Sequence, residues 1–174
     1  LKRIIDSMLF LARADAQKVC LNRQKIQLQS FIENIFSIFE YQAEEQHCNF
    51  VLKLEATELL ADPEQLQQAL YNLLSNALIH GGKHRTIYVH SYRKIINKLP
   101  MIALSVVTSG LEIAPEHLPH IFERFYQCSS SRQSYHQTGG LGLSIVASIM
   151  TLHQGMYQAI NSAEGICFEL LFPD

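Results

Sequence analysis

The chain has 174 residues, of which 48% are hydrophobic and 17% are charged, and this content can bury one core of ordinary size. The net charge of −2 gives no reason to expect a nucleic-acid partner. The cysteines, at 20, 48, 128 and 167, lie too far apart for metal-type Cys-x-x-Cys pairs, and no apolar run of about 18 residues predicts a membrane span, so a reduced, cytosolic setting is expected.

Residues 1 to about 17 are predicted to form an amphipathic helix. Its apolar face consists of Leu1, Ile4, Ile5, Met8, Leu11 and Ala12. The chain does not begin with a methionine and starts within this helix, so we expect it to be a piece of a longer protein. The helix can dock on its own domain or belong to a helical dimer bundle, and the second interpretation is favoured. We therefore divide the chain into residues 1–20, a helix with its linker, and residues 21–174, a folded domain.

The rest of the chain mixes strands and helices without strict alternation. Predicted strands, rich in β-branched or aromatic residues or in apolar ones, lie at 25–28, 50–54, 59–61, 87–92, 101–107, 156–160 and 165–171. Helices are predicted over about 30–47, 62–79 and 141–153, and a turn region from Lys94 to Pro100 joins two of the strands. This order predicts an α+β protein, with helices on one face of a mixed, mostly antiparallel sheet, and not a doubly wound parallel fold.

The helix that begins at Asp62-Pro63 carries a polar stripe opposite its leucine face. Asp62 suits the N-cap position and Pro63 the first helical position, and Gly81-Gly82 ends the helix. The stripe consists of Gln65, Gln68, Asn72, Asn76 and His80. Carboxamides can coordinate a hard cation through oxygen while they donate from nitrogen to phosphate. A solvated helix face is the alternative for the same spacing.

The stretch Gly139-Gly140-Leu141-Gly142-Leu143 places three glycines directly before an apolar helix. Backbone amides can there approach an anion, with the positive end of the helix behind them. The polar segment from Gln127 to Thr138 before it is typical of a mobile lid, in which Arg132 is a candidate for phosphate contact. Lys83 and His84 are further candidates, although each can equally be a solvated surface residue. With the asparagine helix, the glycines indicate a nucleotide site.

Four motifs in this order resemble one family. They are Asp62-Pro63-x-x-Leu66 to Asn72-Leu-Leu-x-Asn76, Val107-Thr-Ser-Gly110, the segment from Pro115 to Tyr126, and Gly140-Leu-Gly142-Leu. The chain from about Lys25 to Pro173 looks like the catalytic, ATP-binding domain of two-component sensor histidine kinases, in the GHKL ATPase superfamily. Residues 1 to about 16 are similar to the end of the second helix of the dimerisation and phosphoacceptor domain. Residues 116–126 most resemble the branch that senses heavy metals such as copper or silver.

The resemblance implies a two-layer α/β sandwich of the GHKL (Bergerat) type that binds ATP and Mg²⁺. Asn76 would hold Mg²⁺ between the phosphates and Asn72 would support it, while Phe122 and Phe125 resemble a pair that packs beneath the lid. The implied nucleotide-binding residues are Asn72, Asn76, His80, Thr108, Gly110, Ile113, Phe122, Phe125, Arg132, Gly140, Leu141, Gly142 and Leu143.

The resemblance places no catalytic nucleophile in this chain, because none of its eight histidines lies in the context of the family's acceptor histidine. The whole protein would be a homodimer, joined through its helical bundle, that phosphorylates a histidine for relay to an aspartate of a response regulator. Its location would be that of an inner-membrane sensor, with this domain in the cytoplasm and any membrane segment outside these residues.

The family's usual Asp-x-Gly-x-Gly pattern is altered here, since Thr108 stands at the aspartate and Glu112 at the second glycine. Three functions therefore remain open: a working kinase domain, a degenerate module that binds partners or dimerises with weak or no ATP binding, and an ATP hydrolase of the gyrase, chaperone or mismatch-repair type. Gln68 and Asn72 stand where such a hydrolase would carry its glutamate base, which disfavours the third function.

Overall fold

The computed structural model describes residues 2–16, 18–128 and 140–174. Its helices are α1 (Lys2–Asp15), α2 (Leu28–Glu45), α3 (Pro63–Gly81) and α4 (Gly142–Leu152). Its strands are β1 (Gln24–Gln27), β2 (Asn49–Leu54), β3 (Glu58–Ala61), β4 (Thr86–Ile96), β5 (Leu99–Ser109), β6 (Met156–Asn161) and β7 (Gly165–Pro173). Among the described residues, no helix is both long enough and apolar enough to cross a membrane.

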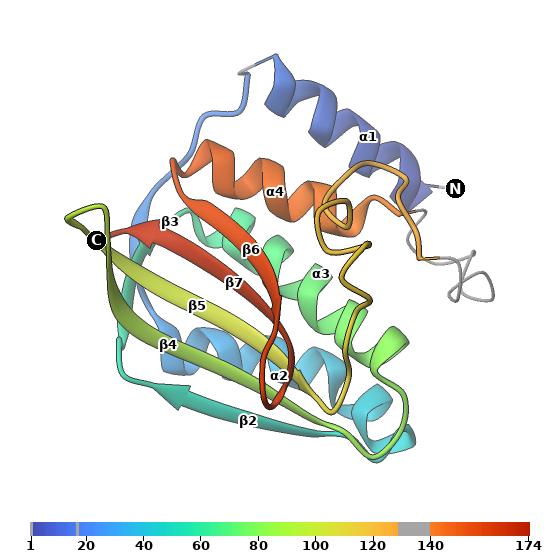
Figure 1. Cartoon of the computed structure of the whole chain (residues 1–174). Coiled ribbons are helices and arrows are strands. Elements are labelled where there is room, and N and C mark those ends of the chain that lie inside the picture. The colour runs from blue at the N-terminus through green and yellow to red at the C-terminus, as the bar shows by residue number, and fades with distance from the viewer. Residues whose placement is uncertain (1, 17, 129–139) are drawn as a thin grey trace.

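The strands form a large sheet in the order β2-β4-β5-β7-β6, and β1 pairs separately with β3. Within the large sheet only β2 and β4 run parallel, and the other neighbours are antiparallel. Figure 1 shows α2, α3 and α4 on one face of this sheet, with the opposite face left uncovered by helices. The prediction of an α+β fold with helices on one face is therefore confirmed.

The turn between β4 and β5 differs from the sequence prediction. Residues 94–100 were expected to form a turn region, but both strands continue to a tight turn at Asn97 and Lys98. These two residues have φ values of 50° and 66°, as a two-residue hairpin turn requires. The prediction was wrong because the pairing of Ile95 with Pro100 and of Ile96 with Leu99 extends the ladder beyond the apolar runs.

Helix α3 begins as the sequence predicts, and its start is tied to the end of α4. The Asp62 carboxylate accepts the backbone N–H groups of Glu64 and Gln65, at 3.0 and 3.1 Å. The backbone N–H of Asp62 donates to Nε2 of the buried His153, just after α4, at 3.0 Å. The two helices that flank the candidate site are thus joined at their far ends.

Helix α1 lies along α4 (Figure 1). Leu11 is buried in this contact, and Arg124 donates to both carboxylate oxygens of Asp15 at 2.7 Å. Another side of α1 exposes Ile5, Met8 and Leu9. In this structure α1 docks on its own domain, while the division of the chain at residue 20 stays a prediction.

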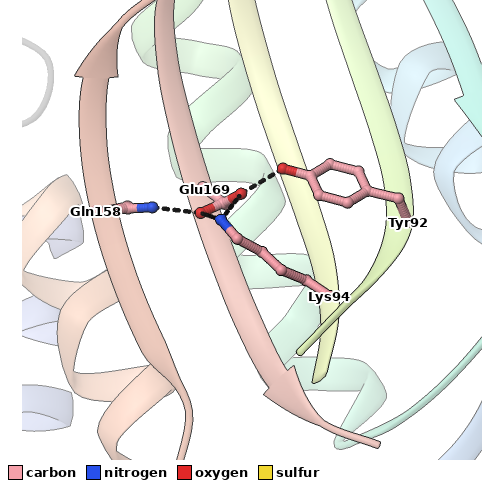
Figure 2. A network of polar contacts seen from close by, with 4 residues as sticks. All are labelled: Tyr92, Lys94, Gln158 and Glu169. Atoms are coloured by element: carbon pink, nitrogen blue, oxygen red, sulfur yellow. Dashed lines mark hydrogen bonds and ion pairs between the residues drawn. The ribbon is translucent and has the colours of Figure 1, made fainter. Parts of the chain in front are cut away.

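The uncovered face of the sheet contains a buried carboxylate. Figure 2 shows the Glu169 side chain receiving hydrogen bonds from Tyr92, Lys94 and Gln158, and the Lys94 Nζ to Glu169 Oε2 distance is 3.1 Å. Burial by itself would raise the pKa of Glu169, but these donors outweigh burial and lower it. The pKa of Tyr92 is raised, mainly by burial and secondly by the hydrogen bond to the Glu169 carboxylate. This ionised network links β4, β6 and β7.

Candidate nucleotide-binding site

A cavity of about 620 Å³ lies between the C-terminal half of α3, the end of β5, residues 111–128 and the start of α4. Its volume falls in the range of small-molecule and cofactor sites, roughly 300–1,000 Å³. From α3 the wall includes Asn76, Ala77, Ile79 and His80, and from the start of α4 it includes Gly142 and Leu143. The asparagine helix and the glycine stretch, far apart in sequence, therefore face one space.

The N-terminus of α4 forms one end of this cavity. The first backbone bond within the helix runs from Ile145 N–H to Leu141 O, at 3.0 Å, and Leu141 offers no side-chain cap. The preceding N–H groups, of Gly142, Leu143 and Ser144, are thus available to an acceptor from outside the helix. Together with the positive end of the helix dipole, they suit a phosphate group.

Gly140 and Gly142 allow close approach at this end. Gly140 has φ +70°, and a Cβ atom there would lie 3.0 Å from the backbone of Phe125. A Cβ atom on Gly142 would lie 3.2 Å from Asn72 Oδ1. The glycines therefore bring the start of α4 against α3 and against the segment that carries Phe125.

The asparagines of α3 have different environments. Asn76 lines the cavity, and its carboxamide forms no hydrogen bond within the described part of the chain. Asn72 does not line the cavity; its Nδ2 donates to Gln68 O at 3.0 Å, and its Oδ1 faces Gly142. His80 lies at the exposed mouth of the cavity, and partial burial of its imidazole lowers its pKa. Of these two asparagines, Asn76 is thus the one that a ligand can reach, and Asn72 supports the contact between helices.

The other end of the cavity is mainly apolar. Its walls there include Leu111, Ile113, Ile166 and Phe168, and Thr108 is the buried polar side chain among them. Asn161 holds the backbone of Ile113 on both sides, because its Oδ1 accepts from Ile113 N–H at 3.0 Å and its Nδ2 donates to Ile113 O at 2.7 Å. This pairing fixes the segment after β5 against the hairpin of β6 and β7.

Arg85 braces the same end from outside the cavity. Its Nε donates to Gly81 O and its Nη1 to Ser109 O, each at 3.1 Å. A Cβ atom on Gly110 would lie 2.3 Å from Arg85 Nη1, so the glycine leaves room for this guanidinium. The ends of α3 and β5, and with them Thr108, are thereby held together.

Residues 111–128 close the remaining side. His117 and Tyr126 both line the cavity, and His117 Nδ1 lies 2.7 Å from the Tyr126 hydroxyl. Phe122 packs against Tyr157 and Phe168 with ring centroids 4.7 and 6.2 Å apart, and does not line the cavity. Phe125 is 59% exposed, and only its backbone is fixed, through its N–H to Gly140 O at 2.9 Å.

The structure brings together most of the site residues predicted from sequence. Those on the cavity wall are Asn76, His80, Thr108, Ile113, Gly140, Gly142 and Leu143. Those beside it but not on its wall are Asn72, Gly110, Phe122, Phe125 and Leu141. Lys83 and His84 are exposed and do not line it, and Arg132 lies outside the described residues.

Several lining or bracing residues were missed from the sequence. They are Arg85, Leu111, His117, Tyr126, Gln127, Cys128, Asn161, Ile166 and Phe168. Most lie in irregular segments, or on strands whose pattern of apolar residues indicates burial but not contact with a ligand. Only the resemblance, which marks the segment from Pro115 to Tyr126, carries a signal for some of them.

The comparisons with known proteins assign the family. Residues 61–174 match the family described as histidine kinase-, DNA gyrase B-, and HSP90-like ATPase. The chain belongs to this ATPase family. The matched residues run from the last residue of β3 to the C-terminus and include α3, α4 and the whole cavity wall.

Curated relatives extend the similarity of this ATPase family member to nearly the whole chain. Sensor histidine kinase CusS of Escherichia coli (strain K12) is 34% identical over 171 residues, which are 98% of this chain and 35% of the relative. Sensor protein CzcS of Cupriavidus metallidurans is 36% identical over 174 residues, or 99% and 36%. Probable sensor kinase SilS of Salmonella typhimurium is 32% identical over 177 residues, or 98% and 34%. The chain spans about a third of the length of these relatives.

Solved structures share the fold of the ATPase domain. The catalytic domain of histidine kinase ThkA has a TM-score of 0.74 at 24% identity, covering 88% of this chain and 96% of that chain. Full-length ShkA in complex with AMPPNP has a TM-score of 0.80 at 21% identity, covering 98% of this chain and 35% of that chain. At these identities the likeness establishes the architecture.

Proposed function

We propose that this chain is the ATP-binding catalytic domain of a sensor histidine kinase, which transfers the γ-phosphoryl group of ATP to a histidine outside these residues for relay to a response-regulator aspartate. The observation that carries the proposal is the cavity in which Asn76 faces the open N-terminus of α4. The sensor kinases among the relatives support it, as does the ShkA structure in complex with AMPPNP.

The residues present suit a polyphosphate with Mg²⁺. Asn76 would hold Mg²⁺ through its amide oxygen, a hard ligand, on the wall of a cavity that phosphate groups can enter. The N–H groups at the start of α4 offer donors to the phosphates. Bound Mg²⁺ would neutralise charge on the phosphates. Phosphoryl transfer depends mostly on such placement and charge neutralisation, which this chain supplies without a nucleophile of its own.

We place the acceptor histidine and the sensor segments outside these residues, and the dimer contact in a helical bundle to which α1 belongs. The exposed Ile5, Met8 and Leu9 of α1 support a continuing helical bundle that makes the whole protein a homodimer. The ThkA structure solved with response regulator TrrA supports a response regulator as the partner. We place this domain in the cytoplasm, as part of an inner-membrane sensor; the relatives named sensor histidine kinase CusS support its membership of a sensor protein.

The competing function is the degenerate module, for which the specific observation is the pair of departures at Thr108 and Glu112, both on the cavity wall. The two functions differ in nucleotide binding. A degenerate module would keep the fold and its stability, but nucleotide would not raise its melting temperature.

Thermal unfolding of the purified chain with Mg²⁺ and increasing ATP tests the proposal. Binding at 100 times the dissociation constant adds about 2.7 kcal/mol, which for a domain of this size corresponds to a rise of roughly 5–11 °C. The Asn76→Ala variant should lose most of the Mg²⁺-dependent part of this rise. The matched control is Gln67→Ala, an exposed position of α3 away from the cavity, which should behave as the unmodified chain.

Two results would contradict the proposal. The first is no rise in melting temperature at millimolar ATP, which selects the degenerate module. The second is a Mg²⁺-dependent part of the rise that is as large in the Asn76→Ala variant as in the unmodified chain, which removes this asparagine from the metal site.

A further inference from the structure

Thr108 is a buried residue on the wall of the cavity, at its apolar end. The residue is 1% exposed and lines the cavity, and its hydroxyl forms no hydrogen bond with any described residue. Its methyl carbon Cγ2 lies 2.9 Å from the position that a Cβ atom would take on Gly81, so the methyl group faces α3. Because the residue lines the cavity, its hydroxyl is a group that can bond a ligand there.

The spacing along α3 separates this hydroxyl from the phosphate end. Asn72 touches Gly142 at the start of α4, and Gly81 touches Thr108. Gly81 follows Asn72 by nine residues, which corresponds to about 13 Å along the helix axis. A nucleotide with its phosphates at the start of α4 therefore extends its base toward Thr108.

The walls around Thr108 suit a flat ring. Leu111, Ile113, Ile166 and Phe168 are apolar, and Thr108 is the polar side chain among the described cavity-lining residues that is more than nine-tenths buried. Apolar walls contact either purine equally well. Selection between the purines at this end then depends on what the Thr108 hydroxyl can bond.

A hydroxyl can both donate and accept, and it rotates to suit its partner. It can accept a hydrogen bond from the 6-amino group of adenine, or donate one to the 6-oxo group of guanine. A carboxylate can only accept, so it would favour the amino group and repel the oxo group. We propose that Thr108 makes this a purine site that selects only weakly between adenine and guanine, so that adenosine and guanosine nucleotides bind with similar affinity. This inference rests on the proposed function.

Calorimetric titration of the whole chain with ADP, GDP and UDP in Mg²⁺ tests this assignment. We expect ADP and GDP dissociation constants within about fivefold of each other, and UDP at least about tenfold weaker because its smaller ring leaves Thr108 unpaired. Thr108→Val keeps the shape and removes the hydroxyl, so it should weaken ADP and GDP alike by about three- to tenfold. Thr57→Val, at an exposed threonine between β2 and β3, is the matched control and should change neither.

Thr108→Asp provides the opposite change. It should keep or tighten ADP binding and weaken GDP binding by about tenfold or more, because the carboxylate cannot donate to the oxo group. Circular dichroism checks that this variant folds. If this variant does not fold, the comparison of the unmodified chain with Thr108→Val is sufficient to test the assignment.

The possible failures are distinguishable. ADP binding at least about 30-fold tighter than GDP in the unmodified chain would overturn the purine assignment and leave the proposed function standing. Equal binding of UDP and ADP, or no effect of Thr108→Val, would overturn it in the same way. Absence of binding by all three nucleotides would overturn the proposed function, and the purine assignment with it.

Discussion

Acidification should destabilise the fold through His153. Its Nδ1–H donates to Ile149 O at 2.8 Å and its Nε2 accepts the Asp62 N–H at 3.0 Å, which is the pattern of a neutral imidazole. Protonation of Nε2 would place two N–H donors against each other. Burial is the main cause that lowers the pKa of His153, with a smaller lowering from Arg23, and these exceed the raising effects of the Ile149 carbonyl and the Asp62 carboxylate.

The sign of the effect follows from this lowered pKa. Above the unfolded-state pKa of about 6.5 the histidine is neutral in both states, so its full contribution to stability is present. As the pH falls below about 6.5, the unfolded chain takes up the proton first, and stability decreases by up to about 1.4 kcal/mol per pH unit until the folded-state pKa is reached. Between pH 7.5 and 5.5 we therefore expect His153 to account for a loss of about 1 kcal/mol.

The His153→Phe variant isolates this contribution. It keeps a ring against Phe172, whose centroid lies 5.5 Å from that of His153, but it leaves the Asp62 N–H unpaired. The variant should lose about 1–3 kcal/mol at pH 7.5, measured by urea unfolding, and this difference from the unmodified chain should shrink by about 1 kcal/mol at pH 5.5. A difference that stays constant or grows on acidification would refute the reasoning.

Three other predictions concern single contacts. Glu169→Gln should cost about 1–3 kcal/mol in urea unfolding at pH 7. Because the pKa of Glu169 is lowered in the folded state, this difference should shrink as the pH falls from about 4 toward the folded-state pKa; a cost unchanged at pH 3 would contradict the ionised network. Gly140→Ala should destabilise the fold by about 1 kcal/mol or more and weaken ATP binding, because φ is +70° and the new Cβ would lie 3.0 Å from the Phe125 backbone. Titration with ATP measures the affinity, and an unchanged affinity would count against the role of this turn. A double-mutant cycle of Asp15→Ala and Arg124→Ala should give a coupling of about 0.2–1 kcal/mol that decreases in 1 M salt, and coupling insensitive to salt would show that the pair is not a surface ion pair.

Local signals explain how much of the fold could be predicted. The start of α3 was predictable because Asp62 accepts from N–H groups two and three residues later, a contact set by adjacent sequence. The β4–β5 turn was not, because the ladder from Ile95 to Pro100 depends on pairing between strands and not on the apolar pattern of either. The same limit applies to Arg85, whose partners Gly81 and Ser109 meet only after folding.

Close approach at a glycine shapes both ends of the candidate site, but only one of the two approaches could be predicted from sequence. At the phosphate end, Gly142 lets α4 approach Asn72, and a glycine before a helix is visible in sequence. At the other end, Gly81 lets the Thr108 methyl group reach α3. The sequence does not reveal this contact, because the two residues lie 27 positions apart on different elements. The two glycine contacts fix α3 against α4 and against β5, and therefore fix the length of the cavity between them. The proposed contact with phosphate can thus be inferred from motifs. The proposed contact of Thr108 with the base is implied in the sequence only by the family resemblance, and its geometry comes from the assembled fold.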